Sequence, residues 1–196
     1  MRLVDPDTVA LHNLHRQTLY LERDVTSQRP KVELAAERLH EANGEVQIEA
    51  HAEAFDAESA DRLLEGIGLA LDASDNLEAR FALNDACQRL GIPWIHGAIA
   101  GAQGLCLCVF PGGPCLRCLY PNPPSPSERP RLDEQGVLNA AASLVASLQV
   151  AQALAVLTQS PSVQRCLLSV DAWTWDCEKI ELPRRASCSV CSKSAH

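Results

Sequence analysis

Residues 68–99 read GLALDASDNLEARFALNDACQRLGIPWIHGAI, and this stretch predicts the fold class of the chain. The short apolar run at 68–73 is typical of a buried parallel strand. A helix is expected over 77–90, because its pattern stops at Gly91, and a second strand follows over 94–99. A strand, a helix and a strand at this spacing are typical of a βαβ unit.

The rest of the chain continues this alternation of strands and helices. Helical spacing of apolar residues and strict alternation of apolar and polar residues mark the elements. The further expected strands are Arg2–Asp5, Glu45–Ala52, Gly104–Phe110 and a pair within Leu167–Leu182, and the further expected helices are Arg29–Asn43, Glu58–Glu65 and Val137–Leu157. We therefore predict a Rossmann-like α/β fold, with a mostly parallel sheet and flanking helices.

Length and composition narrow the class of protein. The chain has 196 residues, of which 46% are hydrophobic, so it can form one sizeable core and is not wholly disordered. Only 4% are aromatic, so we expect a core of Leu, Val, Ile and Ala. The formal net charge of −8 argues against a protein that binds nucleic acid through its phosphate backbone.

The cysteine count bears on the cellular compartment. An odd number of cysteines, nine, cannot be fully paired within one chain. The N-terminal residues Met1–Asp7 lack the apolar region of a secretory signal. We therefore favour a reduced, cytoplasmic compartment with metal-bound or free thiols over a disulfide scaffold.

The segment Val137–Leu157 contains no charged residue and is nearly long enough to span a bilayer. However, Asn, Gln and Ser interrupt it, and neither a Lys/Arg cluster nor an aromatic belt flanks it. A buried core or interface helix is therefore favoured, and we expect no membrane association.

Two Cys-x-x-Cys pairs give the clearest chemical signal. They are Cys115 with Cys118, and Cys188 with Cys191. Two such pairs can form a four-thiolate zinc site of the structural kind, which would fasten the C-terminal tail to the body. The alternatives are a redox dithiol in one pair or an incidental spacing. The first pair follows Pro-Gly-Gly-Pro, which favours a turn over the helix start that a redox dithiol requires.

The remaining thiols have the settings of core residues. They are Cys87, Cys106, Cys108, Cys166 and Cys177.

A second group of polar residues could hold a nucleotide. Its members are Asp5, Asn13, Arg16, Gln17, Lys31 and Asp75. An acidic residue at the end of the first strand, such as Asp5, can bind a ribose, Asp75 lies at the carboxyl end of a strand, where α/β sheets bind ligands, and the cations suit phosphates. Each also has an ordinary interpretation: Arg16 and Lys31 as solvated surface charges, and Asp75-Asn76 as a helix N-cap. On the helix that carries Lys31, we expect Arg38 to lie on the exposed face.

Ordered motifs along the whole chain resemble those of the ThiF/MoeB/HesA family, the bacterial relatives of ubiquitin-activating enzymes. The motifs are Asp5-Pro-Asp7-Thr-Val9, His12-Asn13-Leu-His-Arg16-Gln17, Lys31-Val32 with Ala35-Ala36, Asp72-Ala-Ser-Asp75-Asn76 with Arg80 and Asn84, and Pro93, Gly97, Gly101 and Gly104. Both cysteine pairs stand where the family has its structural zinc.

The resemblance implies an adenylyltransferase that binds Mg-ATP and activates the C-terminal glycine of a small ubiquitin-like sulfur-carrier protein, of thiamin or molybdopterin type. It also implies a homodimer. The implied cofactors are ATP, Mg²⁺ and Zn²⁺. The implied roles are the ribose for Asp5, the phosphates for Asn13, Arg16 and Gln17, charge neutralisation for Lys31, and Mg²⁺ for Asp75, with Asn76 beside it at the nucleotide.

On this basis we expect one ThiF-type domain over 1–196. Its nucleotide-binding-like part is 1–118, an irregular crossover loop rich in proline is 119–134, and a helix, late strands and the zinc tail occupy 135–196.

Three features depart from the family pattern. The family opens with a strand, a GxGxxG-type loop and a helix, and we expect this first βα unit to be missing, through a misplaced start or natural shortening. Leu132 stands where many members have a crossover-loop cysteine, and Gln152 and Ala155 replace a common acidic and basic residue. We therefore expect impaired adenylation, and the alternative is a noncatalytic, zinc-stapled binding or scaffold remnant.

Overall fold

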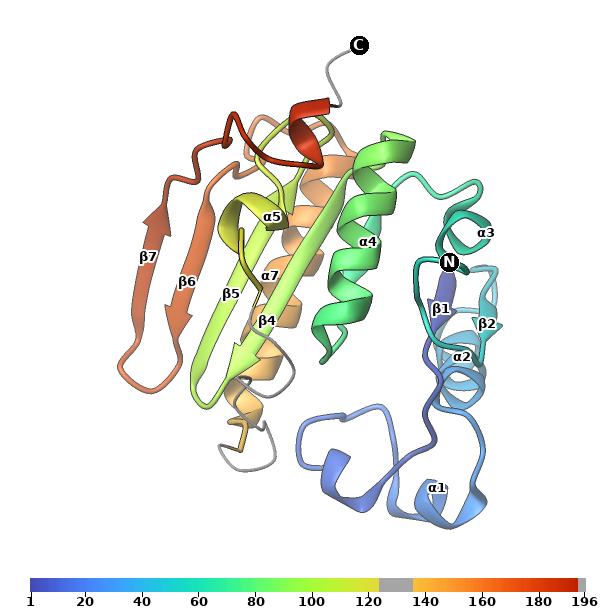
Figure 1. Cartoon of the computed structure of the whole chain (residues 1–196). Helices are drawn as coiled ribbons and strands as arrows, with labels where there is room; N and C mark the ends of the chain where they lie inside the picture. The colour runs from blue at the N-terminus through green and yellow to red at the C-terminus, as the bar shows by residue number, and fades with distance from the viewer. Residues whose placement is uncertain (124–135, 194–196) are drawn as a thin grey trace. The chain divides into compact units, whose positions relative to one another are not determined.

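The computed structural model describes residues 1–123 and 136–193 (Figure 1). The chain divides into two compact units, Met1–Ser59 and Ala60–His196.

The first unit contains a small parallel sheet covered by a helix. Strand β1 (Arg2–Val4) pairs in parallel with β2 (Glu49–His51), and helix α2 (Lys31–Ala42) packs against both. The predicted strand at 45–52 is shorter than expected, because its partner β1 offers only three residues. The predicted helix begins at Lys31 because Pro30, with ψ of 137°, is extended.

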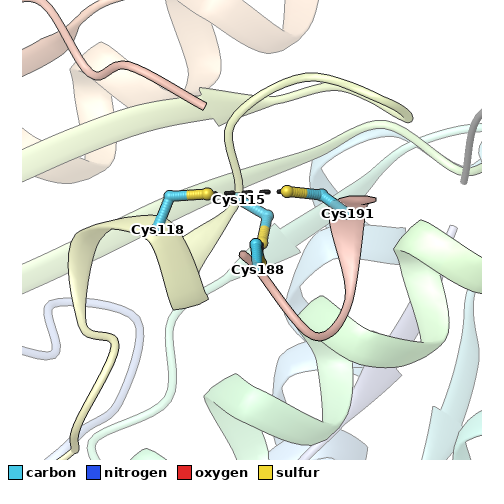
Figure 2. Close-up of side chains that lie close together, drawn as sticks. All are labelled: Cys115, Cys118, Cys188 and Cys191. Carbon is cyan, nitrogen blue, oxygen red and sulfur yellow. Dashed lines mark hydrogen bonds between the residues drawn. The ribbon is translucent and has the colours of Figure 1, made fainter. Parts of the chain in front are cut away.

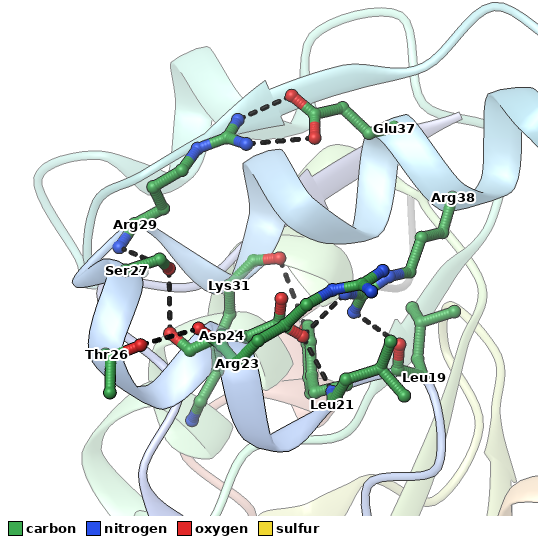
Figure 3. A network of polar contacts seen from close by, with 11 residues as sticks. Leu19, Leu21, Arg23, Asp24, Thr26, Ser27, Arg29, Lys31, Glu37 and Arg38 are labelled. Atoms are coloured by element: carbon green, nitrogen blue, oxygen red, sulfur yellow. Dashed lines mark hydrogen bonds and ion pairs between the residues drawn. The ribbon is translucent and has the colours of Figure 1, made fainter.

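Two short helices of this unit have no counterpart among the predicted elements. They are the 3-10 turn η1 (Leu11–Asn13) and helix α1 (Glu22–Ser27). In α1 the carboxylate of Asp24 accepts the N–H of Leu21 at 2.6 Å, which caps the first turn. The same carboxylate pairs with the Arg38 guanidinium of α2 at a distance of 2.6 Å. Figure 3 shows this contact between the two helices. The ion pair between Asp24 and Arg38 thus stabilises α1. The sequence of α1 is too polar for a helix to be predicted there from the spacing of apolar residues.

The prediction that Arg38 lies on an exposed helix face is wrong. Its guanidinium points to the start of α1, where it also donates to the carbonyl of Leu19 at 2.5 Å (Figure 3). Burial of Asp24 opposes ionisation, but the Leu21 N–H and the Arg38 charge hold the pKa of Asp24 below its usual value. Arg38 is therefore a structural residue of this unit.

The second unit is built on a five-stranded sheet with the strand order β3-β4-β5-β6-β7. Its strands are β3 (Ala70–Asp72), β4 (Trp94–Ala100), β5 (Gln103–Val109), β6 (Leu167–Asp171) and β7 (Asp176–Ile180), and its described helices are α3 (Ala60–Leu64), α4 (Leu77–Leu90), α5 (Leu116–Leu119), α7 (Asn139–Leu157) and the 3-10 turn η3 (Cys191–Lys193). Helix α4 has the predicted bounds, and Gly91 ends it with a φ of 73°.

The prediction of an α/β fold with flanking helices is confirmed. Whether two neighbouring strands run parallel or antiparallel follows from the connection between them. Helix α4 joins β3 to β4, and this pair is parallel as expected. Strands β4 and β5 are joined by a tight turn at Gly101, where φ is 60°, so they pair antiparallel. The pairs β5/β6 and β6/β7 are also antiparallel. The expectation of parallel pairing thus holds for β1/β2 and β3/β4, whereas β4 to β7 form an antiparallel meander.

Helix α7 packs on β4 and β5, and Figure 1 shows it behind these strands. By length and composition α7 could span a membrane, but one side of it is buried in the protein, as predicted for a core or interface helix. The side chains that face the sheet are Ala141, Val145, Gln149 and Ala153. The opposite face is exposed and apolar, with Leu154 59% and Leu157 63% accessible.

We predict that Arg38→Ala destabilises the protein by about 2 kcal/mol at neutral pH, because it leaves the buried Asp24 carboxylate without its ionic partner. The pKa of Asp24 is lower in the folded state than in the unfolded state. Its contribution is therefore present at neutral pH and is lost as the pH falls through the folded pKa. In denaturant unfolding, the difference in unfolding free energy between the wild type and Arg38→Ala should become smaller as the pH is lowered. Arg23→Ala, at an exposed position of α1, is the control: the Arg23 charge also lowers the pKa of Asp24, but it is the weakest of the causes, so its loss should destabilise far less. An equal effect of both variants would refute the role of Arg38.

Candidate functional site

The four cysteines of the Cys-x-x-Cys pairs converge in the second unit. All four side chains are buried, and their sulfur atoms lie within 4.8 Å of one another. Figure 2 shows the four side chains converging from two segments of the chain. The Sγ atoms of Cys115 and Cys188 are 3.7 Å apart, and those of Cys118 and Cys191 are 3.5 Å apart. A zinc tetrahedron with Zn–S bonds of about 2.3 Å has sulfur–sulfur edges of about 3.8 Å. These residues therefore fit a zinc ion.

Backbone amides supply the electrostatic complement of such a site. The N–H of Arg185 points at Cys118 Sγ with an N···S distance of 3.4 Å, and the N–H groups of Val190 and Cys191 donate to Cys188. Although burial opposes ionisation of Cys188, these amides and the neighbouring thiols lower its pKa to about 7. Ionised thiolates are the form that binds zinc.

One detail of the first pair differs from the prediction. Cys115 is not part of a simple turn, because it is the N-cap of the four-residue helix α5. The redox alternative rested on such a helix start, but the closest sulfur contacts join one motif to the other. The arrangement therefore favours a shared metal site over a dithiol within one motif.

Helix α4 holds this cysteine cluster in place. The fully buried Asn84 accepts the N–H of Leu116 at 2.8 Å, and Asp85 pairs with Arg117 in a two-pronged contact. One turn later, Gln88 donates to the carbonyl of Phe110 at 3.0 Å. Polar residues on one side of α4 thus orient the loop that carries the first cysteine pair.

In the first unit, Asp5 lies in the loop after β1, and Lys31, the first residue of α2, contacts the same loop at Asp7. The Lys31 ammonium is 3.0 Å from Asp7 Oδ2, and the Lys31 N–H donates to the Asp7 carbonyl. Asp5 Oδ1 accepts the N–H of Asp7 at 2.8 Å, so Asp7 links the two residues. Lys31 is only 5% exposed, which contradicts the interpretation of this residue as a solvated surface charge. Asp7 belonged to the sequence motif, but its role as the link could not be inferred from it.

Asn13 ends η1, and Arg16 and Gln17 lie in the turn that follows it. The N–H groups of Arg16 and Gln17 both donate to the Asn13 carbonyl. Asn13 is buried and its Oδ1 accepts the N–H of Ala10, whereas Arg16 is partly exposed and donates to the His12 carbonyl. The Oε1 atom of Gln17 is buried and has no hydrogen-bond partner among the described residues.

Asp75 and Asn76 follow β3 in the second unit. Asn76 is the N-cap of α4, and its Oδ1 accepts the N–H of Ala79 at 2.8 Å, so the ordinary interpretation as a helix cap is confirmed for this residue. The Asp75 carboxylate is exposed, and in the described parts of the chain it makes no hydrogen bond or ion pair. It is therefore available to an external cation.

The structure also reveals a buried pair that the sequence did not single out. Asp72 Oδ2 and His96 Nδ1 are 2.7 Å apart, and both side chains are 1% exposed. Asp72 ends β3 and His96 lies opposite it on β4. Asp72 opens the motif Asp72-Ala-Ser-Asp75-Asn76 of the sequence, but nothing in the sequence indicated its pairing with His96.

The remaining cysteines divide into two groups. Cys87, Cys106, Cys108 and Cys166 are buried, as predicted for core residues, and burial raises the pKa of Cys87 to about 12 and that of Cys106 to about 11. The same prediction is wrong for Cys177, which is exposed because every residue of β7 is exposed.

Comparisons with known proteins agree on one family. The model of the ThiF family matches residues 1–190. The chain is 38% identical over 197 residues to a sulfur carrier protein adenylyltransferase of Thermus thermophilus, an alignment that covers 96% of this chain and 72% of the relative. It is 35% identical over 193 residues to "Adenylyltransferase and sulfurtransferase MOCS3" of Aedes aegypti, which covers 97% of this chain but only 44% of the relative.

A solved structure of E. coli MccB with ATP shares the fold. The TM-score is 0.78 at 19% sequence identity, and the match covers 97% of this chain and 58% of the MccB chain. At this identity the likeness concerns the fold alone.

We predict one zinc ion per chain at the four-cysteine cluster. Protein purified without added metal should contain about one equivalent of zinc by elemental analysis. Cys188→Ser should lower the zinc content and loosen the tail, since metal binding contributes to folding. Cys177→Ser, which replaces an exposed thiol, should keep the metal. Full zinc occupancy in a Cys115→Ser/Cys188→Ser double variant would overturn the assignment.

Proposed function

Because the chain belongs to the ThiF family, we propose that it catalyses ATP-dependent adenylation of the C-terminal glycine of a small ubiquitin-like sulfur-carrier protein. The relative from Thermus thermophilus, which is named for this activity, supports the reaction class. The observation that carries the proposal is the setting of Lys31. Its side chain is buried, and its ammonium lies 3.0 Å from the Asp7 carboxylate. A buried cation held by one carboxylate still has N–H groups to offer to an anion.

In this reaction a carboxylate oxygen of the carrier attacks the α-phosphorus of ATP. A bond forms between that oxygen and phosphorus, the bond from phosphorus to the bridging oxygen breaks, and pyrophosphate leaves with the electron pair. Two anions must approach each other, so the protein must offset their repulsion and position them. No side-chain nucleophile is required.

The roles of the first unit follow from this requirement. We assign Asp5 to the ribose hydroxyls, and Asn13, Arg16 and Gln17 to the phosphates. The partly exposed Arg16 guanidinium offers N–H donors to a phosphate, and Gln17 would have to do so through its side-chain NH₂, because its buried Oε1 can only accept a hydrogen bond. Lys31, oriented by Asp7, offsets the negative charge that develops on the phosphates.

In the second unit we assign Asp75 to Mg²⁺ and Asn76 to the nucleotide beside it. The exposed Asp75 carboxylate has the oxygen chemistry that Mg²⁺ prefers. When bound, the metal would offset phosphate charge. The four cysteines would hold zinc in a structural role, because four thiolates leave no open position for a substrate.

We propose further that the 196 residues by themselves adenylate weakly. They contain no GxGxxG loop, whose backbone N–H groups would bind phosphate at a helix N-terminus. The second candidate function is that of a noncatalytic binding or scaffold protein. The lack of a GxGxxG loop within the 196 residues favours this candidate as well. The two candidates differ in whether exchange activity appears once a glycine-rich segment is joined upstream.

The complex with the carrier is proposed to be noncovalent or to stop at the acyl-adenylate. Leu132 stands at the family's crossover-loop cysteine, and this position lies outside the described residues. The exposed Cys177 is the accessible alternative among the nine thiols for any covalent sulfur chemistry.

We also propose a cytoplasmic homodimer in which the exposed face of α7 contacts a second copy. This face carries Leu144, Val150, Leu154 and Leu157, which are 38% to 63% exposed, and α7 has no charged residue. An uncharged apolar face of this length is typical of a protein interface.

ATP–pyrophosphate exchange with a sulfur carrier tests the main proposal. In a polypeptide that includes a glycine-rich segment upstream, Asp75→Ala and Arg16→Ala should each lower exchange about a hundredfold, because each removes charge stabilisation of the phosphates. Arg23→Ala, an exposed arginine in the same unit as Arg16, should leave it unchanged. Robust exchange by the 196 residues alone would show that the glycine loop is dispensable.

For the homodimer, we expect Leu154→Glu to shift the protein from dimer to monomer in sedimentation velocity, because it places a charge in the apolar contact. Leu11→Glu makes the same change at a residue that is 64% exposed, close to the 59% of Leu154, and should leave the dimer intact. A monomeric wild-type protein, or an unchanged Leu154→Glu dimer, would exclude this interface.

A further inference from the structure

The buried residue Asp72, at the end of β3, contacts β4, α4 and α7 of the second unit through its side chain and its backbone carbonyl. Its Oδ2 atom lies 2.7 Å from His96 Nδ1 of β4 and 3.5 Å from Arg80 Nε of α4. Its backbone carbonyl accepts the side-chain amide of Gln149 of α7 at 2.7 Å. Burial opposes the ionisation of Asp72, but the contacts with His96 and Arg80 keep its pKa below the usual value.

The other oxygen of this carboxylate fixes the loop that carries Asp75. Asp72 Oδ1 accepts both the N–H of Ser74, at 2.9 Å, and its hydroxyl, at 2.6 Å. Arg80 donates to the Ser74 carbonyl at 2.5 Å. On the other side Asn76 is fixed as the cap of α4. Asp75 is therefore an exposed residue between two anchored neighbours, which restricts where its carboxylate can point.

Only one nitrogen of His96 takes part in this network. Because the Asp72 carboxylate is ionised, His96 Nδ1 must carry the hydrogen and donate it. The Nε2 atom is buried and has no hydrogen-bond partner among the described residues. The contribution of His96 thus depends on one N–H group at the Nδ1 position.

Gln149 reaches the same place from the other face of the sheet. Its amide donates to the carbonyls of Asp72 and Ile95, at 2.7 and 3.1 Å. The path crosses Gly97, where a Cβ atom would lie 2.5 Å from the Gln149 side chain. A glycine is therefore required at this position of β4 for the amide to reach the end of β3.

We propose that His96 and Gln149 are positioning residues, which act through Asp72 and Ser74 to hold the Asp75 carboxylate in the direction that a nucleotide-bound divalent cation requires. This inference rests on the proposed function, because it takes Asp75 as the metal ligand. Neither residue touches the substrate. Their effect is preorganisation: a fixed carboxylate loses less conformational freedom when the cation binds.

The test measures binding of Mn²⁺, as a spectroscopic substitute for Mg²⁺, to the full chain in the presence of ATP, by electron paramagnetic resonance. His96→Leu, which keeps the bulk but removes the N–H, should weaken binding about tenfold, the range expected for a hydrogen bond to a charged group. His96→Asn should bind within about twofold of wild type, because its amide N–H can take the place of Nδ1–H. His40→Leu, the same change at an exposed histidine, is the control.

A second readout follows the loop itself. Hydrogen exchange at the Ser74 amide should be faster in His96→Leu and near normal in His96→Asn, while the β5 amides and the zinc content stay unchanged. If His96→Leu does not fold, Gln149→Met should give the same loss of Mn²⁺ binding and of Ser74 protection.

The outcomes separate this inference from the proposed function. If Asp75→Ala weakens Mn²⁺ binding but His96→Leu and Gln149→Met do not, the positioning role is refuted and the nucleotide site stands. If Asp75→Ala has no effect on Mn²⁺ binding, both proposals are contradicted. Equal losses in His96→Leu and His96→Asn would also refute the role given to the Nδ1 hydrogen bond.

Discussion

A carboxylate buried at the end of a strand must be paired, and the second unit is arranged around that requirement at Asp72. An ionised group inside a protein is costly unless charges and hydrogen bonds compensate it. Here the carboxylate is compensated by His96 of β4, Arg80 of α4 and the N–H and hydroxyl of Ser74, while Gln149 of α7 satisfies the backbone carbonyl of Asp72. The same contacts that satisfy Asp72 also define the relative register of these elements and the course of the loop at Asp75.

Helix α4 connects this buried network to the cysteine cluster. Its N-terminus is capped by Asn76, beside the exposed Asp75, and its later turns hold the first cysteine pair through Asn84 and Asp85. The thiol cluster in turn brings together two segments that are 73 residues apart in sequence, Cys115 and Cys188. A structural zinc at the four cysteines would therefore fasten the tail to the segment that α4 holds. The N-terminus of α4 in turn lies beside Asp75, the proposed Mg²⁺ ligand.

The sequence predicted those features that local spacing determines. The bounds of α4 followed from its apolar periodicity and Gly91, and the zinc ligands from two Cys-x-x-Cys spacings. Features that depend on distant partners were not predictable: α1 is stabilised by the ion pair with Arg38, and His96 was indistinguishable from an ordinary strand residue. Cys177 was misjudged because strand-like sequence does not reveal whether a strand lies at the sheet edge.

The proposed reaction is the transfer of an adenylyl group from ATP to the C-terminal carboxylate of a carrier protein. The most direct measurement is the intact mass of a ubiquitin-like sulfur carrier with a C-terminal glycine, after incubation with Mg-ATP and the protein joined to a glycine-rich upstream segment. The account predicts a carrier heavier by one adenylyl group, and no such product with Asp75→Ala. Carriers of thiamin and molybdopterin type that both keep their original mass would contradict it.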